Sequence, residues 1–297
     1  MSVVTVSNLK GGVGKTALAT NLSHAFAKRM CETLLIDLDP QGDASTLFEI
    51  VRHVQATTLD SLGTNLFQRF LSQTKNEIRE VRDGLYLLDV RRLSAMLQAD
   101  PLTGEGKLFS RVIESLSMNF DHIVIDTPPV WGNAHRAAFE CSDLVIVPVD
   151  PSEMSVRAAV GLLNRVSEDM AGAALLVRTL VQSRATRVSR ESTRHLQATF
   201  EGDGDEAIGN CRPKQVSLKG LSPSSLKIFL SSVALPRSEI VHLLSYRKKT
   251  IYEHHALSFI QNAYTLLAKE VEALFAACQP EVEEEDEESS FGELLAF

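Results

Sequence analysis

The sequence has few cysteines, and their spacing argues against disulfide or zinc chemistry. The four cysteines are widely separated and form no Cys-x-x-Cys pair; they are Cys31, Cys141, Cys211 and Cys278. Cysteines paired at short spacing are typical of disulfide frameworks and of zinc sites. The pattern therefore predicts free thiols in a reducing cytoplasm.

Long hydrophobic runs are also missing. The N-terminus shows no charged-then-apolar leader, and no later segment approaches a membrane-spanning length. We therefore expect neither export nor membrane insertion. The composition, 44% hydrophobic and 23% charged among 297 residues, is ordinary for a globular protein and fits one α/β domain with a tail.

A glycine-rich turn near the N-terminus predicts a phosphate-binding loop. The segment KGGVGKT, residues 10–16, follows the β-forming residues Val3–Val6 and precedes a helical pattern that begins at Ala17. Glycines let backbone N–H groups and the following helix N-terminus point at phosphates. Lys15 is then expected to contact the β- and γ-phosphates, and the Thr16 hydroxyl to bind Mg²⁺.

Two further strand patterns end in carboxylates. Thr33–Ile36 is followed by Asp37 and Asp39, and His122–Ile125 is followed by Asp126. One aspartate after a strand is more often a turn former or a helix cap. Because ligands of open α/β sheets bind outside the carboxyl ends of the strands, the three acids and the loop together predict one nucleotide site. We expect Asp126 to hold Mg²⁺ through water, and Asp37 is a second metal candidate.

These motifs resemble those of the ParA/MinD family of P-loop ATPases. The deviant Walker A motif of that family reads Lys-Gly-Gly-x-Gly-Lys-Thr, which residues 10–16 match, and Leu9 stands where the general P-loop pattern has its first glycine. Residues 37–41 look like the second conserved loop of the family, residues 126–129 like its Walker B motif, and Leu144–Val149 like its next core strand. The resemblance covers most of residues 1 to about 185.

The resemblance implies a role for each motif residue. Lys10 is the signature lysine that reaches across an ATP-sandwich homodimer, Asp39 positions or polarises the attacking water, and Lys15 completes the catalytic set. Pro236 resembles a late proline near the adenine, although Leu235 replaces the usual isoleucine. The implied cofactors are ATP and Mg²⁺, and the implied ATP-binding residues are Lys10, Gly11, Gly12, Val13, Gly14, Lys15, Thr16, Ala17 and Pro236.

Two segments depart from the family pattern. Ala17 stands where the family often has a second hydroxyl residue, which predicts weaker phosphate contacts. Residues 201–233 align with nothing in the family pattern, so the far side of the sheet is not predicted. Residues 50–84 and 91–106 lack a clean period and are expected to face partners or to act as switch regions.

The periodicity predicts a doubly wound, mostly parallel sheet flanked by helices, as in P-loop NTPases. The expected strands are Val3–Ser7, Thr33–Ile36, Leu85–Leu88, His122–Ile125, Leu144–Val149 and Ala174–Val181. Helical spacing follows the loop and recurs over residues 108–116, 134–139, 156–166 and 257–275. We expect an ATPase domain over residues 1–279 and an acidic tail over residues 280–297.

The tail carries eight acids and no base after Pro280. Such a run is typical of a disordered, solvated tail. Its apolar end, which contains Phe291 and Phe297, leaves open a docking peptide or an acidic mimic of DNA. Because MinD-like relatives bind membranes through a basic C-terminal helix, the acids argue against a membrane partner.

A basic surplus lies within residues 178–250, where thirteen lysines and arginines face six acids. Three of the arginines share one face if Ser189–Phe200 is helical; the candidate DNA contacts are Arg184, Arg187, Arg190 and Arg194. A helix face that is merely exposed to solvent would show the same spacing of arginines. The resemblance favours salt-sensitive, non-specific DNA binding by the nucleotide-bound dimer.

Two functions from different classes remain after the sequence is read. The first is a cytoplasmic, nucleoid-associated ATPase that partitions or positions DNA or another cargo, with a ParB-like partner stimulating hydrolysis. The second is an ATP-dependent switch that controls a division, flagellar or envelope-polysaccharide complex without binding DNA.

Overall fold

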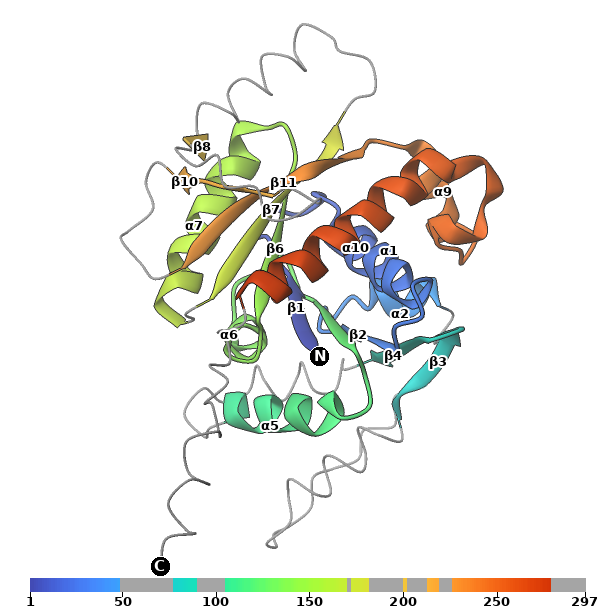
Figure 1. The fold of residues 1–297 in the computed structure, drawn as a ribbon, viewed down its shortest axis with the longest axis horizontal. Coiled ribbons are helices and arrows are strands. Elements are labelled where there is room, and N and C mark those ends of the chain that lie inside the picture. The colour runs from blue at the N-terminus through green and yellow to red at the C-terminus, as the bar shows by residue number, and fades with distance from the viewer. Residues whose placement is uncertain are drawn as a thin grey trace, which may run out of the picture.

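The computed structural model describes residues 1–48, 77–89, 105–169, 172–181, 200–201, 213–218 and 226–278. These residues form a nine-stranded sheet in the order β3-β4-β2-β5-β1-β6-β7-β11-β9 (Figure 1). Its strands are β1 (Ser2–Val6), β2 (Thr33–Asp37), β3 (Arg79–Arg82), β4 (Leu85–Asp89), β5 (His122–Asp126), β6 (Leu144–Val149), β7 (Ala173–Val181), β9 (Lys214–Gln215) and β11 (Lys227–Pro236). A separate pair joins β8 (Phe200–Glu201) to β10 (Ser217–Leu218).

The sheet is parallel except at its two edges, where β3 and β9 run antiparallel to their neighbours. Every residue of β1, β2, β5 and β6 is buried. Burial on both faces explains why these strands read as continuous apolar runs. The predicted doubly wound, mostly parallel sheet is confirmed.

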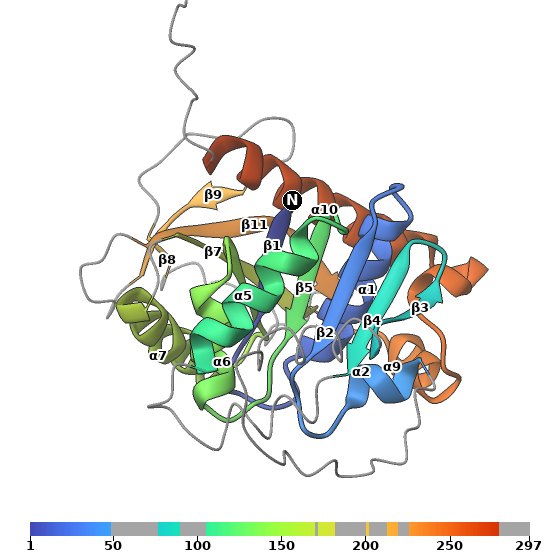
Figure 2. The ribbon, with the colours of Figure 1, turned by 90° about the horizontal axis from the view of Figure 1, so that it is seen from below.

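Helices cover both faces of the sheet (Figures 1 and 2). One face packs against α1 and α10, and the other packs against α5, α6 and α7. The α-helices are α1 (Lys15–Ala27), α2 (Asp43–Leu47), α5 (Glu105–Ser117), α6 (Asn133–Glu140), α7 (Glu153–Asp169), α9 (Glu239–Tyr246) and α10 (Ser258–Cys278). Two short 3-10 helices, η1 (Ile251–Glu253) and η2 (His255–Leu257), connect α9 to α10.

Helix α1 fixes the phosphate-binding loop to the core. Leu18, Leu22 and Phe26 recur at four-residue spacing and are fully buried among β-strand and α10 side chains. Burying each of these side chains stabilises the fold by roughly 1.5–3 kcal/mol. The loop that precedes α1 is therefore attached to one of the most firmly packed elements of the domain.

Several features of the fold were not predicted. Strand β11 extends the parallel sheet beyond β7, and α9 follows it. Arg79–Arg82 forms the antiparallel edge strand β3 within a segment that shows no clean period. The helix predicted over residues 189–200 is wrong at its last residue, because Phe200 lies in β8; its other residues lie outside the described ranges.

Among the described residues, no helix combines the length and the apolar character that a membrane span requires. The acidic tail lies outside these residues.

Candidate nucleotide-binding site

The loop between β1 and α1 has the backbone conformation that glycine permits. Gly12 and Gly14 have φ angles of 75° and 90°, which L side chains rarely adopt. A Cβ atom added at either position would meet nothing within 4 Å. Conformation rather than space therefore requires glycine here. Gly14 begins α1 and no side chain caps the helix, so its first N–H groups are free to bind an anion.

Three neighbouring strands hold this loop in place. The Asn8 amide donates to the Pro148 carbonyl at 2.8 Å, and the Lys10 N–H donates to Asn8 Oδ1 at 2.9 Å. On the next strand, the Thr179 hydroxyl donates to the Val13 carbonyl at 2.8 Å. These contacts fix the loop without a nucleotide, so little ordering entropy has to be lost when one binds.

Lys15 lies inside the loop. The side chain is buried, and its Nζ donates to the Lys10 carbonyl at 3.2 Å. Burial lowers the pKa of Lys15, and the negative charges of Asp126 and Asp39 oppose that shift. Since an ammonium group has three donors, Lys15 keeps donors for phosphate oxygens. Its contact with the β- and γ-phosphates stays a prediction.

Asp126 is a buried carboxylate without a hydrogen-bond donor. It is fully buried at the end of β5, opposite Val6 of β1 and Asp37 of β2, and neither of its oxygens has a hydrogen-bond partner. Burial raises its pKa well above the ordinary value, as does the charge of Asp37; the nearby Thr16 hydroxyl, which does not meet hydrogen-bond geometry, and the charge of Lys15 act in the opposite direction. A buried carboxylate without a donor costs several kcal/mol unless a cation compensates it. The donor set of Thr16 and Asp126 fits Mg²⁺, which prefers oxygen ligands.

Asp37 organises the second loop. Its Oδ1 accepts from the Asp39 N–H at 3.2 Å, and its Oδ2 accepts from the Ser45 N–H and hydroxyl at 3.0 and 2.9 Å. Burial raises the pKa of Asp37 to about 6, while the Ser45 donors oppose the shift. Because three donors already occupy this carboxylate, its main contribution here is to shape the loop. Its role as a metal ligand stays a prediction.

Asp39 lies next to the phosphate-binding loop. It is buried, and its Oδ1 accepts from the Gln41 N–H at 2.9 Å. The Leu38 N–H donates to the Asp126 carbonyl at 2.9 Å, which joins this loop to the end of β5. Asp39 and Asp126 both act electrostatically on Lys15, so the predicted residues do converge.

Lys10 contacts its own chain. Its Nζ donates to Asp150 Oδ2 at 2.5 Å and to Ser152 Oγ at 2.8 Å. Asp150 follows β6, the strand beside β1. Asp150 Oδ1 accepts from the Ser152 N–H at 2.9 Å, so these residues form a compact receptor for the lysine.

The family model AAA_31, which describes an AAA domain, matches residues 1–171, more than half of the chain. The chain belongs to this family. The chain is 35% identical over 176 residues to an uncharacterised protein of Methanocaldococcus jannaschii, and 29% identical over 157 residues to the chromosome partitioning protein ParA of Myxococcus xanthus. These matches cover 57% and 50% of the chain, and 66% and 51% of the relatives' lengths. The predicted place among ParA/MinD P-loop ATPases is confirmed.

Two solved structures share the fold of this chain. Apo McdA of Cyanothece has a TM-score of 0.68 at 17% identity, over 91% of this chain and 99% of that one. The cell division ATPase MinD of Pyrococcus furiosus has a TM-score of 0.62 at 18% identity, over 92% and 99%. At such identities the likeness concerns the fold alone.

Among the remaining predicted site residues, the structure describes Pro236 and Ala17 but not the candidate DNA contacts. Pro236 ends β11 opposite Val181 of β7, at the carboxyl edge where the phosphate-binding loop also lies. Ala17 lies in the first turn of α1, and its carbonyl accepts from the Asn21 side chain at 2.7 Å. The four candidate DNA contacts lie outside the described residues; they are Arg184, Arg187, Arg190 and Arg194.

The sequence analysis missed four residues that hold the loops and Lys10 of the nucleotide site in place. They are Asn8, Ser45, Asp150 and Thr179. Asp150 carries a usable signal, because it follows a predicted strand in the same way as Asp37 and Asp126 do. The others are single hydroxyl or amide residues, and only the folded chain shows what they bind.

Proposed function

We propose that this chain is an ATP-driven dimerisation switch that binds non-specific DNA and partitions or positions a cargo. The observation that carries the proposal is the combination of a phosphate-binding loop with a second lysine at its start. Lys15 is buried inside the loop, whereas Lys10 is partly exposed and held by Asp150. In this proposal Lys15 serves the chain's own nucleotide, and Lys10 serves the partner's nucleotide once it leaves Asp150.

The nucleotide would bind through the loop backbone, the α1 N-terminus and Lys15. Thr16 and Asp126 would hold Mg²⁺, which neutralises charge on the transferred phosphoryl group. Asp39 would orient the attacking water from its position beside Asp126. Phosphoryl transfer depends mainly on such positioning and charge neutralisation, so no covalent role is needed.

Dimer formation would complete the site. If Lys10 of each protomer leaves Asp150 and reaches the nucleotide of the other protomer, hydrolysis becomes coupled to assembly. ATP then favours the homodimer, and loss of the γ-phosphate favours separation. A ParB-like protein that stimulates hydrolysis would set the lifetime of the dimer.

DNA binding would come from the basic surplus of residues 178–250. Contacts to the phosphate backbone give sequence-tolerant, salt-sensitive affinity, which suits a cytoplasmic protein that tracks the nucleoid. The test is binding to random-sequence DNA with Mg·ATP or Mg·ADP across a salt series. We expect tight binding with ATP only and a steep loss of affinity with salt.

A matched pair of variants sharpens this test. Replacing Arg187, Arg190 and Arg194 by alanine should weaken binding and flatten the salt dependence. Arg157→Ala is the control, because Arg157 is an exposed arginine on α7 that pairs with Glu153 at 2.6 Å. Equal affinities of the wild type and the triple variant would contradict the assigned surface.

The second candidate is an ATP-dependent switch for a protein complex. The observation that favours it is the exposed apolar stripe Ile240, Leu243 and Tyr246 on α9, which are 42%, 47% and 73% exposed. Such side chains are typical of protein-binding surfaces. If ATP drives dimerisation but neither nucleotide state binds DNA, this function replaces the first.

A further inference from the structure

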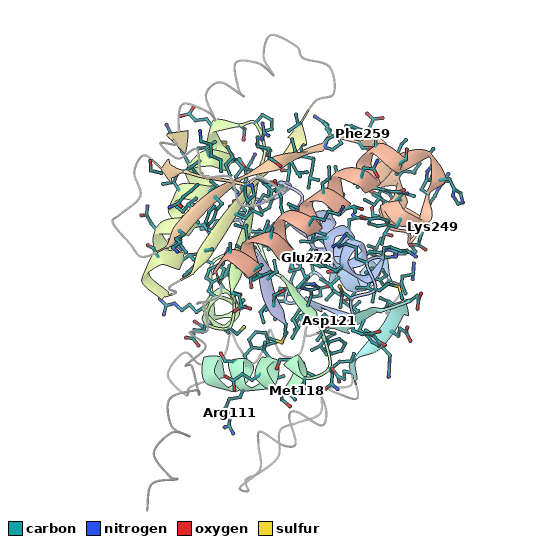
Figure 3. All side chains as sticks on the ribbon, in the orientation of Figure 1. Arg111, Met118, Asp121, Lys249, Phe259 and Glu272 are labelled. Atoms are coloured by element: carbon teal, nitrogen blue, oxygen red, sulfur yellow. The ribbon has the colours of Figure 1, made fainter. Side chains whose placement is uncertain are left out.

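Three metal-ligand side chains meet at the end of the sheet opposite the nucleotide site. Cys31 precedes β2, His122 is the first residue of β5, and Glu272 lies on α10. Their ligand atoms all lie within 4.8 Å of one another. Figure 3 labels Glu272 on α10 and Asp121, which directly precedes His122. We propose that Cys31, His122 and Glu272 bind a thiophilic divalent cation, for which Zn²⁺ is the natural candidate.

The spacing of the three groups suits an ion better than a hydrogen-bond network. His122 Nε2 and Glu272 Oε1 are 4.0 Å apart, which is too long for a hydrogen bond. Zinc binds histidine nitrogen and carboxylate oxygen at about 2.0–2.2 Å, and thiolate sulfur at about 2.3 Å. An ion between the three atoms therefore needs only small side-chain adjustments to reach them.

The histidine is already oriented for such a role. Its Nδ1 shares a 2.6 Å hydrogen bond with the Ser2 hydroxyl, which leaves Nε2 directed at Glu272. The ring stacks on Phe26 with centroids 4.0 Å apart and is buried. Metal-bound histidines usually have their second ring nitrogen hydrogen-bonded in this way, which fixes the orientation of the ring.

The carboxylate is held as well. Arg29 binds both oxygens of Glu272, with Nε at 3.1 Å from Oε1 and Nη2 at 2.6 Å from Oε2. This ion pair compensates the charge of the carboxylate. With a divalent ion present, a Cys31 thiolate and Glu272 would neutralise the ion, and Arg29 would stay as an outer partner that orients the ligand.

The ligand chemistry selects the ion. A thiolate, an imidazole and one carboxylate favour Zn²⁺ over Mg²⁺ or Ca²⁺, which prefer oxygen ligands. Three protein ligands leave the fourth position to water. This site is distinct from the one at Asp126, because His122 begins β5 and Asp126 ends it, about 13 Å away along the strand. Bound metal would tie α10 to two central strands.

The test is a titration of chelator-treated protein with Co²⁺, whose bond to a thiolate gives an intense ultraviolet absorption band. We expect the band to saturate at one equivalent of Co²⁺ and to disappear when Zn²⁺ displaces it. The Cys31→Ser variant should lack the band, and Glu272→Gln should weaken affinity more than about 10-fold, since even outer-shell changes cost about 10–100-fold. Wild-type protein that shows no saturable band would overturn the proposal.

Two controls separate this site from other ligands in the chain. A variant with Cys141, Cys211 and Cys278 all changed to serine should keep the band, because it retains Cys31. The Asp126→Asn variant should also keep it, which excludes the nucleotide site as the source. A band that survives in Cys31→Ser would assign the metal to another cysteine. Because zinc uptake is measured without nucleotide, its failure leaves the proposed ATPase function untouched.

Discussion

The ammonium group of Lys10 lies 2.5 Å from Oδ2 of Asp150 in the same chain. A lysine that serves a partner's nucleotide must leave this ion pair. The side chains of Lys10 and Asp150 are 26% and 13% exposed, so the pair is only partly screened by solvent. In the proposed dimer, the free energy that this contact contributes to the isolated chain would oppose dimerisation.

We predict that Asp150→Asn makes ATP-dependent dimerisation easier. Asparagine keeps the Oδ1 atom that accepts from the Ser152 N–H and loses the charge that holds Lys10. A partly exposed pair of this kind is worth about 0.5–1.5 kcal/mol, and each protomer of the dimer gives up one pair, so the dimer dissociation constant should fall about 5- to 150-fold. The measurement is sedimentation across a protein concentration series with Mg·ATP.

The control for this experiment is Asp143→Asn. Asp143 lies before the same strand, at the end away from the nucleotide site, and accepts from the Val3 N–H at 2.7 Å. It should leave dimerisation unchanged. An Asp150→Asn protein that dimerises more weakly than the wild type would show that the ion pair does not restrain Lys10.

Asp39→Ala should separate ATP binding from hydrolysis. The charge of Asp39 acts on Lys15 and on Asp126, but the residue is not part of the phosphate-binding loop. We expect ATP affinity within about 3-fold of the wild type and a hydrolysis rate at least about 100-fold lower, the usual cost of losing a group that activates the nucleophile. Nucleotide titration and phosphate release measure the two quantities. Hydrolysis at the wild-type rate would refute the role of Asp39.

Two glycine substitutions should have opposite effects on stability. Gly14→Ala forces a side chain into the left-handed region and should cost about 1–2 kcal/mol as well as nucleotide affinity. Gly161→Ala lies in α7, where an added Cβ meets nothing within 4 Å, and should stabilise the fold by about 0.5–1 kcal/mol. Urea unfolding without nucleotide measures both. A Gly14→Ala protein as stable as the wild type would contradict the assigned loop conformation.

The stability of the protein should fall as the pH decreases from about 6.5 towards 4. His24 is buried, its Nδ1 lies 2.6 Å from the Thr250 hydroxyl, and burial lowers its pKa to about 4. The positive charges of Lys28 and Arg82 add to this shift, and Glu253 opposes it. The unfolded chain takes up a proton near pH 6.5 and the folded chain does not, so stability is fully present above pH 6.5 and is lost below it.

His24→Gln tests this linkage. From these pKa values, the loss of unfolding free energy between pH 7 and pH 5 should be smaller by about 2 kcal/mol in the variant than in the wild type. His242→Gln is the control, since His242 is exposed on α9 and should leave the pH dependence unchanged. An identical pH dependence for the wild type and His24→Gln would contradict the buried neutral histidine.

The central strands and the phosphate-binding loop could be predicted because their signals are local. Buried parallel strands read as continuous apolar runs, and the loop needs glycines at fixed positions. Strand β11 was missed because its apolar run is interrupted by Ser231 and Ser232, which bind Glu270 of α10, and its register to β7 shifts after Leu230. The two serines have Glu270 as a hydrogen-bond acceptor only when α10 packs against the sheet.

Contacts between distant residues could not be predicted. Lys10 and Asp150 are 140 positions apart, and Cys31 and Glu272 belong to elements that meet only in the folded domain. The cysteine spacing argued against a zinc site because the chain has no Cys-x-x-Cys pair. A site built from single ligands on separate elements leaves no such short motif in the sequence. The sequence predicted a nucleotide site but not the contact that holds Lys10.

The most direct test of the account is the oligomeric state of the Asp39→Ala protein with Mg·ATP and with Mg·ADP. Sedimentation velocity should show a dimer with ATP and a monomer with ADP, and adding Lys10→Ala should remove most of the ATP-dependent dimer. The same distribution of species with both nucleotides would contradict an ATP-driven dimerisation switch.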